Sequence, residues 1–198
     1  MTSCEIELME SKQLSSEARI FRWLVRDYVK DRLLNESLSV PTRLLDDDVT
    51  LITTDDRDTI SRERLQEAFH NAMNLFWDSF GDIMEEQLEQ VPSTVSSIED
   101  FIVRTCRVVL TQDDVSWGGM VAVTAFITKV ALRYTAREMS HAVSPVIEQI
   151  AFDANEKLAP FIQEGGGWAV FGRAFRTKQP SWLRRTITAI AALVQAYL

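Results

Sequence analysis

The chain has few of the residues on which several common protein classes depend. Of its 198 residues, two are cysteine, seven are glycine and five are proline. The two cysteines, Cys4 and Cys106, give neither a disulfide framework nor the paired spacing of a zinc site, and they favour a reducing intracellular setting. The scarcity of glycine and proline argues against a turn-rich β-sandwich and favours long helices.

Basic charge is also scarce over most of the chain. The formal net charge of −8 argues against nucleic acid as a partner, because nucleic-acid-binding proteins present a basic face. The start, MTSCEIELMESKQ, has acids and no apolar run, so it does not predict a secretory signal. After Glu164, in contrast, the chain has five cations and no acid. Residues 180–198 are therefore expected to form an apolar and basic helix that either associates with an anionic membrane surface or packs on the bundle.

What the chain does have is a long apolar stretch, VSWGGMVAVTAFITKVALRY, from Val115 to Tyr134. A helix that is apolar nearly all round belongs inside a bundle or in a membrane. The uninterrupted part is shorter than the roughly 20 apolar residues that a membrane span needs, and it contains Lys129. The stretch therefore predicts a buried central helix, and the two glycines near its start indicate a close approach of another group to the backbone.

Amphipathic periodicity predicts further helices on both sides of this stretch. One begins near Glu17 after a capping serine, and another runs from Thr59 to about Gln90. The acidic segment 37–58 has no lasting period and is expected to be a mobile loop. No β segment, internal repeat or linker stands out, so the sequence predicts a single all-α domain over residues 1–198. The remaining helices are expected over residues 98–112, 139–161, 168–175 and 180–198.

Catalytic and metal-binding patterns are missing. His70 and His141 are isolated, and neither has a histidine or cysteine partner one turn away. Cys106 lies among valines and leucines, which indicates a small buried hydrophobe rather than a reactive thiolate. The triplet Gly165–Gly167 has no preceding strand and no following Lys-Ser/Thr pair, so it is not a phosphate loop. The sequence predicts neither an enzyme, nor a cofactor, nor a metal site.

Three patches carry more information. On the second predicted helix, Met73, Trp77, Phe80 and Met84 are spaced i, i+4, i+7 and i+11, which places them on one stripe with Gly81-Asp82 in its middle. The second patch is VSWGG at 115–119, which opens the apolar helix. The third is FIQEGGGWAVF at 161–171.

Taken together and in this order, the patches resemble the Bcl-2 family of apoptosis regulators. In that family Asn-Trp-Gly-Arg opens the central helix, and Trp-Ile-Gln-x-x-Gly-Gly-Trp-x-x-Phe follows the next hairpin. The sequence LVRDYVKDRL at 24–33 also resembles the family's fourth homology motif, and the resemblance covers about residues 17–198, with 37–58 in the place of the family's variable loop. The second patch matches at Trp117 and Gly118, and the third matches closely at Gly166, Gly167, Trp168 and Phe171.

The resemblance implies a bundle of eight or nine helices around a buried central hydrophobic hairpin. It also implies a surface groove into which the amphipathic death-motif (BH3) helix of a partner docks. The stripe on the second helix is then an internal BH3-like motif made of Met73, Trp77, Phe80, Gly81, Asp82 and Met84. Residue-by-residue transfer places along the groove Met84, Leu88, Val103, Arg104, Cys106, Arg107, Leu110, Trp117, Gly118, Gly119, Ala122 and Phe126.

One departure from the family pattern concerns charge. The arginine that follows Trp-Gly in the family, and that pairs with an acidic residue of the ligand, is Gly119 here. A charge-assisted bond of this kind contributes about 1.5–3 kcal/mol. Either affinity is lower or another cation substitutes, and Arg104 and Arg107 are the candidates.

The family contains survival proteins and pore-forming effectors on one fold. The fourth-motif match and the bulky Trp77, where the family has leucine, favour a survival protein that captures the BH3 helices of Bax/Bak-like effectors and BH3-only proteins. The alternative is an effector that permeabilises the mitochondrial outer membrane. It is favoured by the Gly81-Asp82 pair, by the Ser-Trp-Gly opening at 116–118 and by RDYV at 26–29, which resembles the Bok-like effectors.

A third hypothesis is a membrane-active helical bundle unrelated to apoptosis. The Gly-Gly-Trp string of the third patch argues against it, because an unrelated bundle has no reason to reproduce that string. The resemblance implies a location in the cytoplasm and at the mitochondrial outer membrane, with the endoplasmic reticulum membrane as an alternative.

Overall fold

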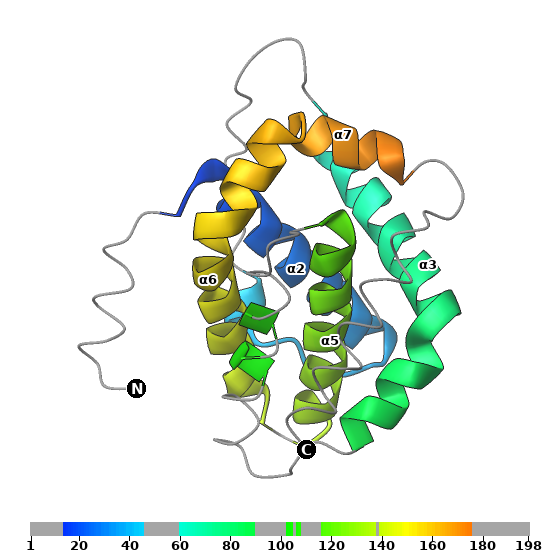
Figure 1. Ribbon diagram of the computed structural model, residues 1–198. Helices are drawn as coiled ribbons and strands as arrows, with labels where there is room; N and C mark the ends of the chain where they lie inside the picture. The colour runs from blue at the N-terminus through cyan, green and yellow to red at the C-terminus, as the bar shows by residue number, and fades with distance from the viewer. Residues whose placement is uncertain are drawn as a thin grey trace, which may run out of the picture.

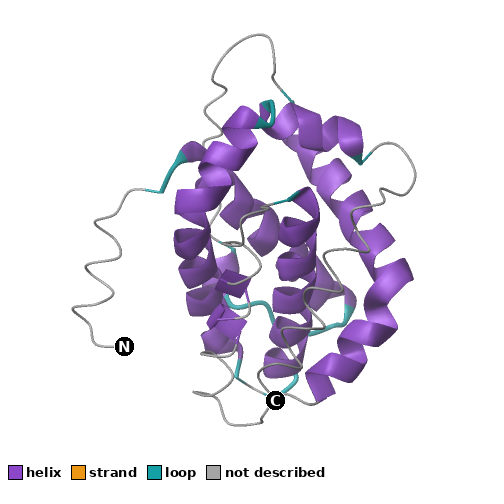
Figure 2. Ribbon diagram, in the orientation of Figure 1, coloured by secondary structure: helices purple, strands orange, loops and turns teal. Residues whose placement is uncertain are grey.

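The computed structural model describes residues 14–45, 60–89, 102–104, 106–107, 116–137 and 139–175. Every regular element in these ranges is helical, and none of them contains a strand (Figure 2). This confirms the all-α prediction. The predicted number of eight or nine helices stays untested, because several predicted helices fall partly or wholly outside the described residues. The elements are α2 (Ser16–Asn35), η1 (Thr42–Leu44), α3 (Arg62–Glu89), α5 (Trp117–Thr135), η2 (Ser140–Ala142), α6 (Val143–Glu164) and α7 (Gly167–Ala174).

Helix α5 is the buried centre of the bundle, as its composition predicts. Ser116 begins it, because the Ser116 Oγ accepts a hydrogen bond of 3.1 Å from the backbone N–H of Gly119. Every residue from 118 to 128 is buried. The two threonines in this run bond to the carbonyl one turn earlier in the same helix, over 2.8 Å from Thr124 Oγ1 and 2.7 Å from Thr128 Oγ1. Their hydroxyls are thereby satisfied without a partner on another helix.

The other helices surround α5. In Figure 1, α6 and α3 lie on opposite sides of α5, and α2 lies behind it. Helix α2 contacts both α5 and α6, and α3 contacts α5 and α7. Ser15 caps α2 by accepting from the N–H of Ala18. The contact of α2 with α6 includes a double ion pair, in which Arg22 and Arg26 reach Glu148 over 2.9 Å and 2.5 Å.

Helices α5 and α6 form the expected central hairpin, joined by η2 (Figure 1). Pro160 is inside α6, close to its C-terminal end, where it has no N–H to donate to the carbonyl of Glu156. The chain then turns sharply into α7. Gly166 and Gly167 make this turn with φ of 86° and 73°, which a residue with a side chain rarely adopts.

The predicted loop over residues 37–58 contains a short helical turn near its start. Residues 42–44 form η1, and the side chain of Leu44 belongs to the hydrophobic core with 4% of its surface exposed. The Leu44 N–H donates to the carbonyl of Pro41 over 2.9 Å, so a short turn delivers one apolar side chain to the bundle. The acidic remainder of the loop and the predicted terminal helix at 180–198 lie outside the described residues. Among the described helices, none is both long and apolar enough to cross a membrane.

Candidate functional site

The predicted BH3-like motif lies in the second half of α3. Met73 is fully buried and Met84 nearly so, while Trp77 and Phe80 are partly buried against the core. Asp82 is exposed, and Gly81 has room around it, because an added Cβ would meet only the Trp77 ring at 3.6 Å. The stripe also includes the fully buried Phe76, which the sequence analysis did not assign to the motif.

Trp77 connects the motif to two other helices. Its indole Nε1 donates a hydrogen bond of 3.0 Å to the hydroxyl of Tyr28 on α2. Burial raises the pKa of Tyr28, so the phenol stays neutral and can accept this bond. On the other side, the Lys129 ammonium of α5 is 5.5 Å from the centre of the Trp77 ring and pairs with Glu85. The motif is thus held by α2 and α5 together.

Most of the described residues predicted for the groove are in the interior of this chain. Ala122 is fully buried, Cys106 and Phe126 are 1% exposed, and all three share one core cluster with Met84. Burial raises the pKa of the Cys106 thiol far above its usual range, with the nearby Asp153 as a second cause, in agreement with an unreactive core cysteine. Gly118 and Gly119 are also buried, and Val103 is half-buried. Leu110 and the side chain of Leu88 lie outside the described residues.

The two candidate arginines differ in their surroundings. Both are exposed. Arg107 binds Asp153 on α6 through its Nη2 and Nε, over 2.9 Å and 3.1 Å. Arg104 makes no ion pair with any residue in the described part of the chain. Its guanidinium is therefore the one available to an incoming carboxylate without breaking an existing bond.

The second and third patches meet in one cluster of rings, which we name the aromatic junction: Trp117, Phe161, Trp168 and Phe171. Trp117 begins α5, and its ring centroid lies 4.9 Å, 5.8 Å and 5.3 Å from those of the other three. Edge-to-face and tilted pairs at such distances stabilise beyond their buried area. The second and third of the patches that carried the resemblance are therefore in contact, and the glycine turn at 166–167 is what brings α7 onto α5.

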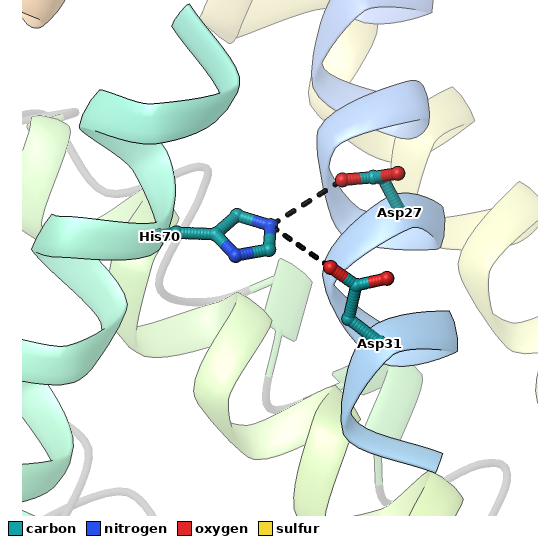
Figure 3. Close-up of side chains that lie close together, drawn as sticks. All are labelled: Asp27, Asp31 and His70. Atoms are coloured by element: carbon teal, nitrogen blue, oxygen red, sulfur yellow. Dashed lines mark hydrogen bonds and ion pairs between the residues drawn. The ribbon is translucent and has the colours of Figure 1, made fainter. Parts of the chain in front are cut away.

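A second cluster, which the sequence analysis missed, joins α2 to α3. We name it the polar junction: Asp27, Asp31, Gln66 and His70. Figure 3 shows His70 of α3 pointing between the two carboxylates of α2. Its Nε2 is 3.3 Å from Asp27 Oδ2 and 3.7 Å from Asp31 Oδ2, and Gln66 Nε2 donates to Asp27 Oδ2 over 2.7 Å. The sequence offered a weak signal, since Asp27 and Asp31 are one turn apart, but nothing in it pairs them with a histidine on another helix.

The electrostatics of this junction centre on Asp27. Burial by itself raises the pKa of the Asp27 carboxyl. The hydrogen bonds from His70 and Gln66, together with the charge of Lys30, outweigh burial and hold that pKa below its ordinary value. The carboxylate of Asp27 is therefore ionised at neutral pH although only 9% of its side chain is exposed.

Comparisons with known proteins agree with the resemblance. The family model for apoptosis regulator proteins of the Bcl-2 family matches residues 58–168. The chain therefore belongs to the Bcl-2 family. Members of this family are apoptosis regulators.

Individual relatives of low sequence identity belong to the same family. Bcl-2-like protein 1 of Homo sapiens is 30% identical over 110 residues, which are 56% of this chain and 45% of that protein. The proteins of the same name from Mus musculus and Rattus norvegicus match over the same length with the same identity. The chain thus aligns with about half the length of the curated relatives it matches.

Two solved structures share the fold. One is the Trichoplax adhaerens protein trBcl-2L2 bound to trBak BH3, with a TM-score of 0.63 and 22% identity over 80% of this chain and 99% of that chain. The other is chicken BOK, with a TM-score of 0.59 and 13% identity over 80% of this chain and 96% of that one. At such low sequence identities, these two structures establish the fold of this chain and do not establish its function.

Proposed function

We propose that this protein is a survival member of its family, which captures BH3 helices of pro-apoptotic relatives and so inhibits cell death. The observation that carries the proposal is the double attachment of Trp77. To dock in another protein's groove, the BH3-like motif must release its indole from Tyr28 and its ring from Lys129. It must also expose Met73, which is fully buried. These costs favour a motif that stays in its own fold.

The groove itself is proposed from the family resemblance. A partner helix with apolar anchors at i, i+4, i+7 and i+11 needs an apolar trough, with a cation for its acidic residue. The Trichoplax relative of the same fold is bound to a BH3, which supports this mode of binding. We assign the cation to Arg104, because Arg107 is already bonded to Asp153.

Peptide binding tests the assignment. The full chain is titrated with a fluorescent effector-type BH3 peptide, and affinity is measured for wild type, Arg104→Ala, Arg107→Ala and Arg173→Ala. We expect Arg104→Ala to weaken binding about tenfold or more, because about 1.4 kcal/mol of the pair's contribution corresponds to a factor of ten. Arg173 is exposed on α7 and serves as the matched control. Equal affinity for all four proteins would show that the groove works without an ion pair.

The second candidate function is that of an effector. The fold likeness to chicken BOK and the exposed Asp82 beside an uncrowded Gly81 favour it. Dye release from cardiolipin-containing liposomes separates the two functions. A survival protein releases no dye, with or without BH3 peptide, and suppresses release by an added effector in proportion to its peptide-binding capacity. Release triggered by the peptide at nanomolar protein would identify an effector and end the survival proposal.

We also propose that residues 180–198 bring the protein to anionic membranes, with the mitochondrial outer membrane as its place of action beside the cytoplasm. The support is the sequence: the segment combines Arg184 and Arg185 with the apolar run ITAIAALV at 187–194. Sedimentation with vesicles should show binding that increases with the anionic lipid fraction and decreases with salt. Vesicle binding that persists after Arg184 and Arg185 are changed to glutamine would contradict the proposal that these residues attach the protein to anionic membranes. Binding that does not change with the anionic lipid fraction would contradict it as well.

A further inference from the structure

The polar junction has a geometry that its role as a helix contact does not require. Asp27 and Asp31 are one turn apart on α2, and His70 faces both from α3 (Figure 3). One nitrogen of His70 and one oxygen of each carboxylate all lie within 4.8 Å of one another. The same Nε2 is directed at both carboxylates, so three potential ligand atoms surround one point.

The two distances from His70 Nε2 are close to those between ligand atoms around a four-coordinate zinc ion. With bonds of about 2.0–2.2 Å to imidazole nitrogen and carboxylate oxygen, two ligand atoms on a tetrahedral zinc lie about 3.3–3.6 Å apart. His70 Nε2 is 3.3 Å from the Asp27 oxygen and 3.7 Å from the Asp31 oxygen. The His70 ring is further oriented by an edge-on contact with Tyr28, whose ring centroid is 5.1 Å away. Only small side-chain adjustments would place an ion between the three groups.

Charge and accessibility also fit a divalent cation. Two carboxylates offset the charge of Zn²⁺, and imidazole with carboxylate is a ligand set that zinc accepts. Lys30 Nζ bonds to the other oxygen of Asp27, Oδ1, over 3.3 Å, and Gln66 Nε2 bonds to Oδ2 itself over 2.7 Å, so both groups hold the carboxylate in place. The side chains of His70 and Asp31 are 27% and 40% exposed. An ion can thus enter from solvent, and water can complete the fourth position.

We propose that Asp27, Asp31 and His70 form a zinc-binding site that joins α2 to α3. On binding, the ion takes the lone pair of His70 Nε2, and a proton carried there moves to Nδ1 or to solvent. His70 precedes the BH3-like motif by one turn, so an ion at this site stabilises the arrangement in which α3 lies against α2. None of its three residues is among the proposed groove residues, so its test is independent of BH3 binding.

The experiment is a zinc titration of the full-length, tag-free protein by calorimetry, with the melting temperature measured in parallel. We expect one zinc per chain and a melting temperature that increases with zinc, because an ion that binds only the folded state stabilises it by mass action. The test variant is His70→Gln, which keeps an amide donor for Asp27 but removes the imidazole ligand. Its zinc affinity should fall tenfold or more, since even partners behind a ligand contribute that much. Asp31→Asn should act in the same direction.

The matched control is His141→Gln, which removes the chain's only other histidine, exposed on η2, and should leave affinity unchanged. Cobalt(II) gives a second readout: a visible absorption band of a four-coordinate nitrogen–oxygen site that His70→Gln abolishes. Undiminished zinc affinity in a folded His70→Gln protein would overturn the proposal. So would a cobalt–thiolate band, which would point to a cysteine, or binding only at millimolar metal, which would mean an adventitious ion only.

Discussion

The aromatic junction and the polar junction hold the same bundle together in different ways. Trp117, Trp168 and Phe171 associate through ring packing, and Phe171 has no exposed surface. Asp27 and His70 associate through charge and hydrogen bonds beside solvent. The first contact depends on shape and excluded water, and the second depends on proton and ion concentrations. The stability of the α5–α7 contact should therefore not change with pH or ion concentration. The stability of the α2–α3 contact should change with both.

The largest expected effect is in the aromatic junction. Phe171 contacts Trp117 and Trp168, and its ring is 4.4 Å from Phe175 and 5.8 Å from Phe69 of α3. Phe171→Ala should lower the free energy of unfolding by about 3–5 kcal/mol, the usual cost of emptying an aromatic site in a core. Denaturant unfolding measures it. Arg173→Ala, exposed on the same helix, should change stability by less than about 0.5 kcal/mol. A loss below about 1 kcal/mol for Phe171→Ala would mean that the junction repacks freely.

The next effect concerns the turn that sets α7 on α5. At Gly167 a Cβ meets nothing within 4 Å, so Gly167→Ala should cost only the left-handed backbone, about 1–2 kcal/mol. At Gly166 a Cβ would lie 2.8 Å from Val170 Cγ2, and crowding should add about 1 kcal/mol or more to the same backbone cost. Thermal unfolding compares the two variants. Combining Gly166→Ala with Val170→Ala should recover the added part, and equal losses for both glycines would disprove the clash.

A smaller effect, dependent on pH, is expected in the polar junction. Because the pKa of Asp27 is lower in the folded state than in the unfolded chain, the unfolded chain binds more protons in the interval between the two values. The contribution of Asp27 is therefore complete above its unfolded pKa of about 3.9 and is lost as pH falls through its folded pKa. Asp27→Asn should lower the free energy of unfolding by about 1–2 kcal/mol at pH 6, which is the usual contribution of one hydrogen bond to a charged group.

The measurement is chemical unfolding from pH 6 to pH 2 with a metal chelator present. The difference between wild type and Asp27→Asn should shrink toward the acidic end. A difference that stays constant over this range would indicate packing rather than charge. Phe171→Ala, measured in the same series, should show no such convergence, which sharpens the contrast between the two junctions.

The smallest effect concerns the bond from Trp77 to Tyr28, next to the polar junction. Trp77→Phe and Tyr28→Phe each remove one partner of the hydrogen bond. The double variant should be less destabilised than the sum of the two single variants by about 0.5–1.5 kcal/mol, the net contribution of one such bond. Urea unfolding of the four proteins completes the cycle. Strict additivity would show that the indole and the phenol are not coupled and that this bond does not hold the BH3-like motif against α2.

The comparison also explains what the sequence could predict. The residues of the aromatic junction could be singled out from the sequence because they belong to two short motifs. Trp117, Trp168 and Phe171 each have recognisable neighbours in those motifs. The start of α5 likewise depends on a local contact, the capping bond between Ser116 and the N–H of Gly119. Local patterns of this kind survive folding because they need few distant partners.

The polar junction could not be predicted from the sequence, because its residues belong to no local motif. Asp27 and His70 are 43 residues apart, and each alone resembles an ordinary polar residue on a helix flank. Phe76 was missed beside Trp77 because a stripe of spacing i, i+4 and i+7 does not fix which edge of a broad apolar face turns inward. Leu44 was missed because one apolar side chain in an acidic segment has no periodicity.

The two threonines in the middle of α5 have a consequence for how the central helix is held. A buried hydroxyl that bonded to a neighbouring helix would fix the rotation of α5 about its own axis. Thr124 and Thr128 instead bond to carbonyls of their own helix, so both bonds would survive any rotation or axial shift. At these positions the angular setting of the helix depends on side-chain volume alone. The two hydroxyls would remain satisfied in surroundings of any polarity, so neither needs a hydrogen-bond partner on a neighbouring helix.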